Sequence, residues 1–285
     1  MKGLFWNDYN KCRRKPIFAA ALFSLLGLLP LLLSSCGPLP FAGGEPLQTW
    51  FPFTDTFESG ATNARWHREV ARDDAISLVT PPAGSFGSNV SAKALFFAVK
   101  PGDVVNNGNR AEAAIYNCGQ YQDTMYYAWD FLIPSGDPDS FDWQIIAQWY
   151  QLPDFERGEE FEGQYPHPPV TIVAIPGKIE FKTTIPDEYV VKEMAVAKDT
   201  WYRIVVAIHF DTDKDGWVQA WFGLNNGSLS QMFSDNYMVA TLLNKAGIYW
   251  KLGLYRGYVN QTQATGTNSI YVDNVKIGRS LVEVQ

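Results

Sequence analysis

Along most of the chain, hydrophobic and polar residues alternate with a period of two or form short apolar runs, a pattern typical of β-strands with a buried face. Turn residues separate these segments, for example Pro176 and Gly177. The predicted strands are residues 94–99, 110–116, 125–133, 143–150, 170–175, 178–185, 201–210, 217–223, 248–256 and 269–277. The sequence shows no long helical pattern, so it predicts an all-β protein built as a two-sheet antiparallel sandwich or jelly roll.

The first 50 residues follow a different pattern. In the leader, residues 1–36, five basic side chains against Asp8 give a charge of +4, and an apolar run at 17–33 follows them. A basic start, an apolar run and small residues before a cleavage site are typical of a secretory signal. The run is also marginal in length for a membrane span, so an uncleaved membrane anchor is the alternative.

A Leu-Ser-Ser-Cys sequence that ends at Cys36 resembles the bacterial lipobox, in which the cysteine becomes the lipid-modified N-terminus of the mature protein. Lipid chains on Cys36 would anchor the protein to a membrane. We therefore expect a lipoprotein signal peptide at 1–35, a Pro- and Gly-bearing tether at 36–50 and one folded domain at 51–285. The expected location is the bacterial envelope, facing the periplasm or the cell exterior.

Composition narrows the class of protein further. The chain of 285 residues is 46% hydrophobic and 15% aromatic, which is enough apolar material for a packed core and excludes a disordered protein. Its net charge is −7, and loss of the +4 leader makes it −11. This excludes general nucleic-acid binding, which needs a basic surface. We expect a monomer in which Cys118, the cysteine left after processing, is a small core residue.

The segment 109–116 places charges on one face of a strand. Arg110 and Glu112 share that face, and small apolar residues between them point to the core. Glu112 is then placed to hold the guanidinium of Arg110. An Arg fixed on a rigid sheet suits a substrate carboxylate, because its fork makes two parallel hydrogen bonds. The alternative, which this segment alone favours, is an ordinary cross-strand ion pair on a solvated surface.

The segment 143–150 alternates in the same way. Gln144, Ile146, Gln148 and Tyr150 are predicted on one face of the strand, opposite an apolar face. Two amides and a phenol on one face are typical of a sugar-binding groove, which uses directional hydrogen bonds and an aromatic edge. A solvated antiparallel face explains the composition equally well.

The segment that begins at Tyr249 combines phenols with a cation. Tyr249, Lys251, Gly253 and Tyr255 are predicted to point one way, and the apolar residues between them point to the core. Gly253 in mid-strand is expected to leave room for close approach to the backbone. A phenol beside a cation has a lowered pKa, so Tyr249 next to Lys251 is a candidate base. The alternative is an exposed ladder of Tyr and Lys.

Together these segments resemble a known family. Arg-Ala-Glu at Arg110, Gln-Trp-Tyr at Gln148, Tyr-Trp-Lys-Leu-Gly-Leu-Tyr-Arg at Tyr249 and Ile-Tyr-Val-Asp-Asn-Val-Lys-Ile-Gly at Ile270 occur in that order. The order is similar to that of the heparin lyase I-like and glucuronan lyase-like polysaccharide lyases, and to the motifs of jelly-roll alginate lyases. The resemblance covers roughly 53–278. It implies a concanavalin-like jelly roll with a substrate cleft on the concave face.

One position departs from the pattern of that family. Tyr150 stands where many relatives have His, and in the alginate-type enzymes that His helps to neutralise the carboxylate or takes the proton. His167 ends a long aperiodic loop at 154–168, and it would replace the missing imidazole if the loop folds over the cleft. His67 and His209 lie in an early segment and in a core-like strand.

Alternating aspartates precede Gly216, which is how calcium loops begin. The ligands of such a site would be Asp211, Asp213 and Asp215, but Phe222 stands where the bidentate Glu should be. Asp-Gly between two strands is also a hairpin signal. We therefore expect a hairpin in this segment, and no metal or other cofactor.

The first functional hypothesis is a polysaccharide lyase that cleaves a uronic-acid-containing polysaccharide by β-elimination. The difficult step removes the proton next to a carboxylate, whose negative charge has to be neutralised. Arg110 and Gln148 are expected to hold that carboxylate, and Tyr249 to move the proton with the help of Tyr150. The other expected substrate contacts are Lys251, Gln144, Glu112, Tyr255, Arg256 and His167.

A local positive cleft is expected in this otherwise acidic protein. Arg110, Lys178, Lys182 and Lys251 are the cations that would form it. Arg256 would add to it, unless it turns to the core side and closes a strand end, where it would need a partner. The expected partners are an anionic polysaccharide and, through the lipid anchor, a membrane.

Two other hypotheses come from different classes. The first is a non-catalytic carbohydrate-binding surface lipoprotein on the same fold, which the replacement of His by Tyr150 favours. The second is a glycoside hydrolase, which needs two carboxylates on either side of the scissile bond. The sequence has no Glu-x-Asp-x-x-Glu strand, so we rank the hydrolase last.

Overall fold

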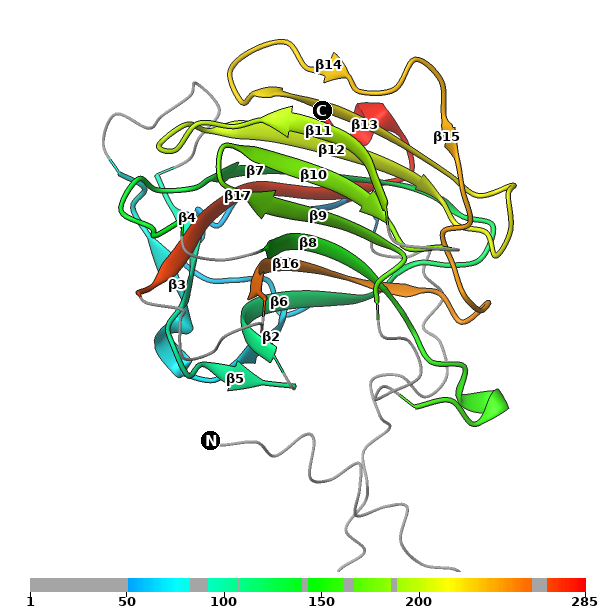
Figure 1. Ribbon diagram of the computed structural model, residues 1–285, viewed down its shortest axis with the longest axis horizontal. Coiled ribbons are helices and arrows are strands. Elements are labelled where there is room, and N and C mark those ends of the chain that lie inside the picture. The colour runs from blue at the N-terminus through cyan, green and yellow to red at the C-terminus, as the bar shows by residue number, and fades with distance from the viewer. Residues whose placement is uncertain are drawn as a thin grey trace, which may run out of the picture. The chain divides into compact units, whose positions relative to one another are not determined.

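The structure, a computed structural model, describes residues 51–82, 92–106, 108–139, 143–160, 167–185, 189–257 and 266–285. In these residues the chain forms two antiparallel β-sheets that pack face to face (Figure 1). The predicted leader, the tether and Cys36 lie outside the described residues. No helix in the described ranges combines the length and the apolar character that a membrane span needs.

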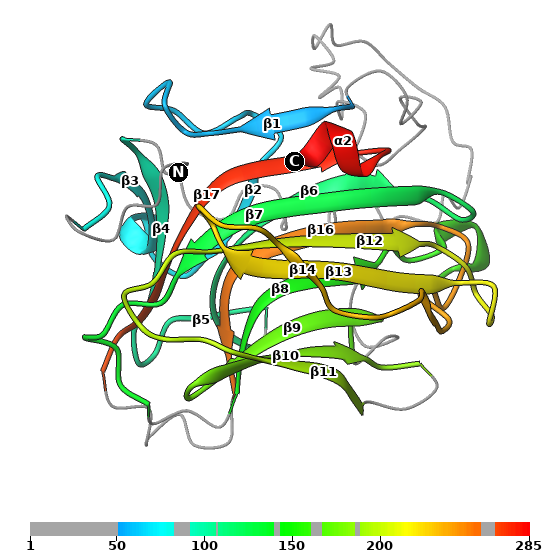
Figure 2. The ribbon, with the colours of Figure 1, turned by 90° about the horizontal axis from the view of Figure 1, so that it is seen from above.

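One sheet, which we call sheet A, runs in the order β14-β13-β12-β7-β17-β4-β3, with β1 beside β17 and β15 beside β13. The strands of sheet A are β1 (Phe53–Asp55), β3 (Ile76–Val79), β4 (Ala94–Val99), β7 (Thr124–Leu132), β12 (Tyr202–His209), β13 (Trp217–Leu224), β14 (Ser230–Gln231), β15 (Tyr237–Met238) and β17 (Asn268–Gly278). Figure 2 shows the short helix α2 (Leu281–Val284), which lies against β17.

The other sheet, sheet B, runs in the order β11-β10-β9-β8-β16-β6-β2, with β5 beside β6. Its strands are β2 (His67–Val70), β5 (Val104–Val105), β6 (Gly108–Gly119), β8 (Gln144–Gln151), β9 (Val170–Ile175), β10 (Lys178–Thr183), β11 (Tyr189–Ala195) and β16 (Ile248–Arg256). Two short 3-10 helices, η2 (Asp73–Ala75) and η3 (Phe155–Arg157), lie in connections. The segments with candidate site residues, 109–116, 143–150 and the one that begins at Tyr249, thus form the adjacent strands β6, β8 and β16.

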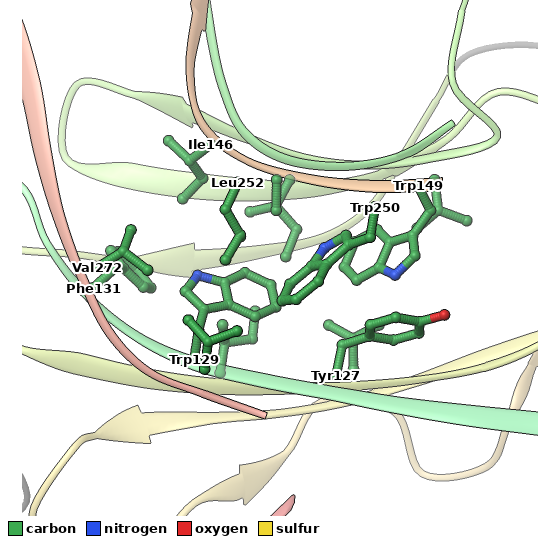
Figure 3. Close-up of a cluster of buried hydrophobic side chains, with 14 of the residues drawn as sticks. Tyr127, Trp129, Phe131, Ile146, Trp149, Trp250, Leu252 and Val272 are labelled. Atoms are coloured by element: carbon green, nitrogen blue, oxygen red, sulfur yellow. The ribbon is translucent and has the colours of Figure 1, made fainter. Parts of the chain in front are cut away.

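Large aromatic side chains fill the space between the sheets (Figure 3). Trp129 and Tyr127 of β7 lie 5.4 Å and 5.1 Å, centroid to centroid, from the ring of Trp250 on β16. Trp149 of β8 stacks on Trp250 at 6.0 Å. The Tyr127 hydroxyl donates a 2.6 Å hydrogen bond to the carbonyl of Cys118, so this buried phenol is satisfied. Such ring pairs add to the burial of their area and fix how the two sheets align.

The strand pattern of the sequence is confirmed. Each predicted segment forms a strand whose ends differ from the prediction by a few residues at most, and 94–99, 170–175 and 248–256 match. The prediction omitted the short strands and β11, an edge strand whose residues are mostly exposed. A strand with little buried face leaves only a weak alternating signal.

The middle of sheet B contains an irregularity that the alternation rule did not predict. The register between β16 and β8 shifts between Leu252 and Tyr255, and the register between β8 and β9 shifts across Ile146. Gly253 adopts a φ of +133°, and a Cβ there would lie 2.4 Å from the Ala111 carbonyl oxygen. The expectation that Gly253 leaves room for close approach to the backbone is therefore confirmed, and it is the neighbouring strand that approaches there. Glycine is required at position 253 because other residues rarely adopt this positive φ.

Two smaller expectations are confirmed. Residues 211–216 join β12 to β13 as a hairpin, and the Asp211 and Asp213 carboxylates accept backbone N–H groups of the same turn. Cys118 is a buried free cysteine, and burial raises the pKa of its thiol to about 12.

In the described residues, no three His, Cys, Asp or Glu side chains are grouped closely enough to hold a metal ion.

Candidate active site on sheet B

The face of sheet B that points away from sheet A, which we call the outer face, brings together most of the predicted site residues. Lys251 of β16 lies directly opposite Gln148 of β8 on one side and Ala114 of β6 on the other. Ala114 in turn lies opposite His67 of β2. Directly opposite residues share a face, so these side chains form one row across four strands. Glu69 and Glu112 form part of the next row.

Two cations and two carboxylates form a connected cluster at the centre of this face. Lys251 Nζ lies 2.8 Å from Glu69 Oε2 and 3.9 Å from Glu112 Oε2. Arg110 Nη1 lies 3.1 Å from Glu112 Oε2 and 3.6 Å from Glu69 Oε2. Gln148 Nε2 donates a hydrogen bond to Glu112 Oε1. Glu112 therefore holds the Arg110 guanidinium, as predicted, and it also orients Gln148.

The cluster is buried, which strengthens its electrostatics. Lys251, Arg110, Glu112 and Gln148 are each less than a tenth exposed. Burial alone would lower the pKa of Lys251, but Glu69 and Glu112 outweigh it and raise that pKa. Burial opposes and Lys251 favours ionisation of Glu69, and the pKa of Glu69 is lowered as a result. Glu69, Arg110 and Lys251 are therefore charged at neutral pH, and the simple solvated ion pair considered for Arg110 does not describe this site.

Three phenols and an imidazole lie beside Lys251. The ring of Tyr249 stacks on Tyr116 at 4.9 Å and lies 5.4 Å from the ring of Tyr150. Tyr116 also meets the exposed His67 ring edge-on at 5.1 Å. Lys251 Nζ lies 5.2 Å from the centre of the Tyr249 ring and 5.9 Å from that of Tyr150. These phenols and the imidazole, which are all able to transfer protons, thus lie close to the charged cluster.

The pKa of Tyr249 differs from the one expected from the sequence. Burial raises the pKa of Tyr249 well above 10, and the nearby Glu69 and Tyr150 raise it further. Burial also raises the pKa of Tyr150, although Lys251 opposes the effect. The expected lowering of the Tyr249 pKa by Lys251 is therefore wrong, because burial and the charge of Glu69 both raise this pKa. Burial lowers the pKa of His67, so its imidazole is neutral at neutral pH.

Aromatic rings also bound the other end of the cluster. The Arg110 guanidinium carbon lies 3.9 Å from the centre of the Tyr255 ring, a cation–π contact. Trp143 meets Tyr255 edge-on at 5.2 Å. Arg110 Nε is buried and has no hydrogen-bond partner among the described residues. A buried donor of this kind favours a ligand that supplies an acceptor.

Gln144 does not join this site. The shift at Ile146 reverses the alternation of β8, so Gln144 lies opposite Ala174 of the core and opposite Arg256. Gln144 is buried and lines a small cavity of about 30 Å³ together with Ala174. The face predicted for Gln144 and Ile146 by strict alternation is therefore wrong, whereas the face predicted for Gln148 and Tyr150 is confirmed.

Arg256 also points to the core side of the sheet, which was the alternative considered for it. It donates hydrogen bonds to the side-chain oxygens of Asn109 and Asn268, at 2.6 Å for Asn268, and to the Gly266 carbonyl at 3.2 Å. Asn268 belongs to sheet A, so Arg256 links the two sheets at a strand end. Burial lowers the pKa of this guanidinium. Arg256 is therefore a structural residue in this fold.

The long loop after β8 is partly tied to the body of the domain. Asn244 Nδ2 and the Asp154 backbone N–H both donate to Glu159 Oε2, at 2.7 and 2.8 Å. Residues 161–166 lie outside the described residues. His167 is exposed ahead of β9, and in the described ranges no hydrogen bond or ion pair joins it to the cluster.

Three residues of the site were not predicted as such from the sequence: Glu69, His67 and Tyr116. Glu69 and His67 lie on β2, a strand of four residues at the edge of sheet B. The alternation of His67 and Glu69 with Arg68 and Val70 is the one signal that could have revealed this strand, and it is too short to decide. Tyr116 continues the face of Arg110 and Glu112 and could have been found by extending that alternation.

The comparisons with known proteins agree with this architecture. An endo-beta-1,4-glucuronan lyase from the fungus Trichoderma reesei is 17% identical, with a TM-score of 0.56 over 84% of this chain and 94% of that chain. A marine PL-14 alginate lyase from Aplysia kurodai is 15% identical, with a TM-score of 0.51 over 73% of this chain and 88% of that chain. At such identities the likeness shows the jelly-roll fold. No curated protein matches the sequence significantly.

The family model described as polysaccharide lyase matches residues 58–276. That range begins before β2 and ends in β17, so it includes every strand that contributes to the cluster on the outer face. The match covers most of the chain and agrees with the order of motifs at Arg110, Gln148 and Tyr249. This chain belongs to the polysaccharide lyase family.

Proposed function

We propose that the protein cleaves a uronic-acid-containing polysaccharide by β-elimination on the outer face of sheet B. The observation that carries this proposal is the cluster of Lys251, Arg110 and Gln148, bordered by phenols and by the His67 imidazole on one rigid sheet. The family supports a lyase, and the lyase folds that resemble this chain come from enzymes named for uronate polymers.

In β-elimination, a base removes the proton next to the uronate carboxylate, a carbon–carbon double bond forms, and the glycosidic oxygen leaves with a proton. The enzyme has to stabilise the extra negative charge on the carboxylate. Arg110 and Gln148 are fixed on neighbouring strands by Glu112, and the free Nε–H of Arg110 is available to a carboxylate oxygen. Preorganised donors of this kind act without rearrangement during the reaction.

The proton transfers divide between two groups of different acidity. Tyr249 and Tyr150 keep their protons at neutral pH, because burial raises their pKa values, so they suit the role of general acid toward the leaving oxygen. Partial burial lowers the pKa of His67 while solvent still reaches its ring, so it suits the role of base. This assignment differs from the sequence-based one, in which Tyr249 was the base.

A second candidate function is a binding protein that holds glycans without cleaving them. Two observations favour it: Tyr150 stands where many relatives have His, and every cation in the cluster already contacts a carboxylate. The half-buried rings of Tyr150, Tyr255 and Trp143 would hold sugars in either case.

The decisive experiment incubates the purified domain with uronate polymers in water labelled with heavy oxygen. β-Elimination gives an unsaturated uronate that absorbs in the ultraviolet, and its products carry no label from water. A hydrolase would incorporate the label and produce no such absorbance. A binding protein would retain the polymer and produce neither signal.

We also propose that the protein is a lipoprotein of the bacterial envelope. The support is the sequence alone: a basic start, an apolar run at 17–33 and the Leu-Ser-Ser-Cys motif ending at Cys36. A lipid on Cys36 followed by the tether would hold the domain at a membrane surface.

A further inference from the structure

The charges on the outer face of sheet B cancel one another. The cations that the sequence suggested for a positive cleft are all on this face, and each contacts a carboxylate. Lys251 and Arg110 contact Glu69 and Glu112, as described above. On β10, Lys178 and Lys182 both lie 3.3 Å from Glu180, and Lys178 also contacts Glu193 on β11. The four cations expected to form a positive cleft are therefore matched by four carboxylates, Glu69, Glu112, Glu180 and Glu193.

The domain as a whole carries a net negative charge. Residues 51–285 contain 18 of the 23 Lys and Arg residues and 28 of the 30 Asp and Glu residues, a net charge of −10. The residues in this range that the structure does not describe include no Lys or Arg, but they include Asp142, Glu162, Asp187 and Glu188. A polyanion that approaches the domain therefore meets a negative field.

The surface on either side of the charged centre is aromatic. Along β16, Tyr249 and Tyr255 lie on the same face with Lys251 between them. Tyr116 and Tyr150 border Tyr249, and Trp143 borders Tyr255. Aromatic rings bind the apolar faces of sugars without regard to charge. The half-buried rings of Tyr116 and Tyr150 thus lie at one end of the ionic centre, and those of Tyr255 and Trp143 lie at the other.

From this arrangement, and given the lyase activity proposed above, we infer that the substrate is sparsely charged, with neutral sugars on both sides of the uronate that is cleaved. A polymer with a carboxylate on every sugar would place negative charges against the aromatic ends and against cations that are already paired. Bringing those carboxylates out of water costs free energy that a compensated cation does not return. A single uronate among neutral sugars meets only the central donors Arg110 and Gln148.

The test uses one backbone at several charge densities. Soluble glucuronan oligomers are carboxyl-reduced to different extents, so that neutral glucose replaces part of the uronate while the linkage stays the same. The expected result is that kcat/KM per remaining uronate rises about fivefold or more as the charge density falls, because each avoided contact charge is worth about that factor in water. Preference for the fully charged oligomer, with a KM that rises steeply with salt, would overturn the inference and leave the lyase function intact.

A charge variant tests whether the paired lysines set this preference. Glu180→Gln removes the carboxylate that Lys178 and Lys182 share, and it lies outside the proposed catalytic cluster. It should raise kcat/KM for the fully charged oligomer about fivefold at low salt, with little effect on the sparsely charged one. Asp215→Asn, in the exposed β12–β13 turn, makes the same charge change as a control. Equal effects of the two variants would contradict local compensation.

The inference can be judged even if the lyase proposal fails. If no oligomer is cleaved, the proposed function falls, and affinity electrophoresis with the same series then measures binding. Tighter binding of the partially reduced oligomers would still support a sparsely charged ligand. Tighter binding of the fully charged oligomer would overturn it.

Discussion

Lys251 Nζ lies 2.8 Å from Glu69 Oε2, although 182 positions separate the two residues in the sequence. The pair joins the edge strand β2 to the central strand β16 across β6. It fixes the ammonium beside Arg110 and Glu112 and keeps it charged. The pair therefore connects the N-terminal part of the domain to the chemistry of the site.

The losses of unfolding free energy caused by removing each partner of this pair should not add in the double variant. Glu69→Gln leaves Lys251 without its nearest carboxylate, and loss of one partner of a buried pair costs about 3–5 kcal/mol of unfolding free energy. Because the double variant with Lys251→Met leaves no unpaired charge, its loss should be smaller than the sum of the two single losses. Urea unfolding measures all three variants.

The same pair makes stability depend on pH in a defined direction. The pKa of Glu69 is lowered in the folded state, so its contribution is present above the unfolded pKa and disappears as the pH falls through the lowered value. Losses of unfolding free energy that add in the double variant would contradict the coupling between Glu69 and Lys251. So would a Glu69→Gln variant whose stability falls at acid pH in the same way as that of the wild type.

The sequence predicted the strands and much of the site because β6 and β16 pair without a register shift from Tyr249 to Arg256 and keep the expected alternation there. Arg110, Glu112, Lys251 and Tyr255 lie on the predicted face for this reason. The exceptions have local causes. The register shift at Ile146 transfers Gln144 to the core side, and a shift of one residue leaves no mark in the hydrophobic pattern.

Pairing between distant strands was the second element that the sequence could not provide. His67 lies in an early segment, far in sequence from the motifs of the site, yet β2 pairs with β6 and brings His67 opposite Ala114. The charge balance on β10 and β11 was missed for the same reason: the lysines were visible in the sequence, but the contacts of Lys178 with Glu193 required the register of the two strands.

Glu159 should stabilise the start of the loop after β8. Its Oε2 accepts hydrogen bonds from Asn244 and from the Asp154 backbone in a buried position. Glu159→Ala leaves both donors without this acceptor, so it should lower the unfolding free energy by about 1–3 kcal/mol. Glu156→Ala, at an exposed position of the same loop, is the control and should change it little. Equal stability of the two variants in urea would show that the loop is not anchored through Glu159.

Cys36 should carry the lipid if the leader is a lipoprotein signal. Cells that express Cys36→Ser should accumulate unprocessed protein without fatty-acid label, whereas the wild type should incorporate the label and fractionate with membranes. Cys118→Ser, which changes a buried cysteine of the folded domain, should leave labelling unchanged. Equal labelling of the Cys36 variant would exclude the lipobox interpretation.

Removal of the Tyr249 hydroxyl should distinguish a lyase from a binding protein. Tyr249→Phe keeps the ring that stacks on Tyr116 and removes only the hydroxyl. Loss of a general acid should lower kcat by about two to four powers of ten, with little change in glycan affinity. Tyr116→Phe is the matched control and should retain most of the activity. Full activity of the Tyr249 variant would transfer the role to Tyr150, whose ring lies 5.4 Å away.

The pH dependence of kcat/KM should identify the base. If His67 takes the proton, kcat/KM should rise through a pKa below 6.5, because burial lowers the pKa of this imidazole, and should then stay flat through neutral and mildly alkaline pH. If a tyrosinate were the base, kcat/KM would instead rise about tenfold per pH unit to above about pH 10, because burial raises the pKa of Tyr249. His67→Gln should remove the acid limb together with most of the rate. A rate that climbs into the alkaline range and is insensitive to His67→Gln would return the role of base to a tyrosine, with the raised pKa limiting the fraction of active enzyme at neutral pH.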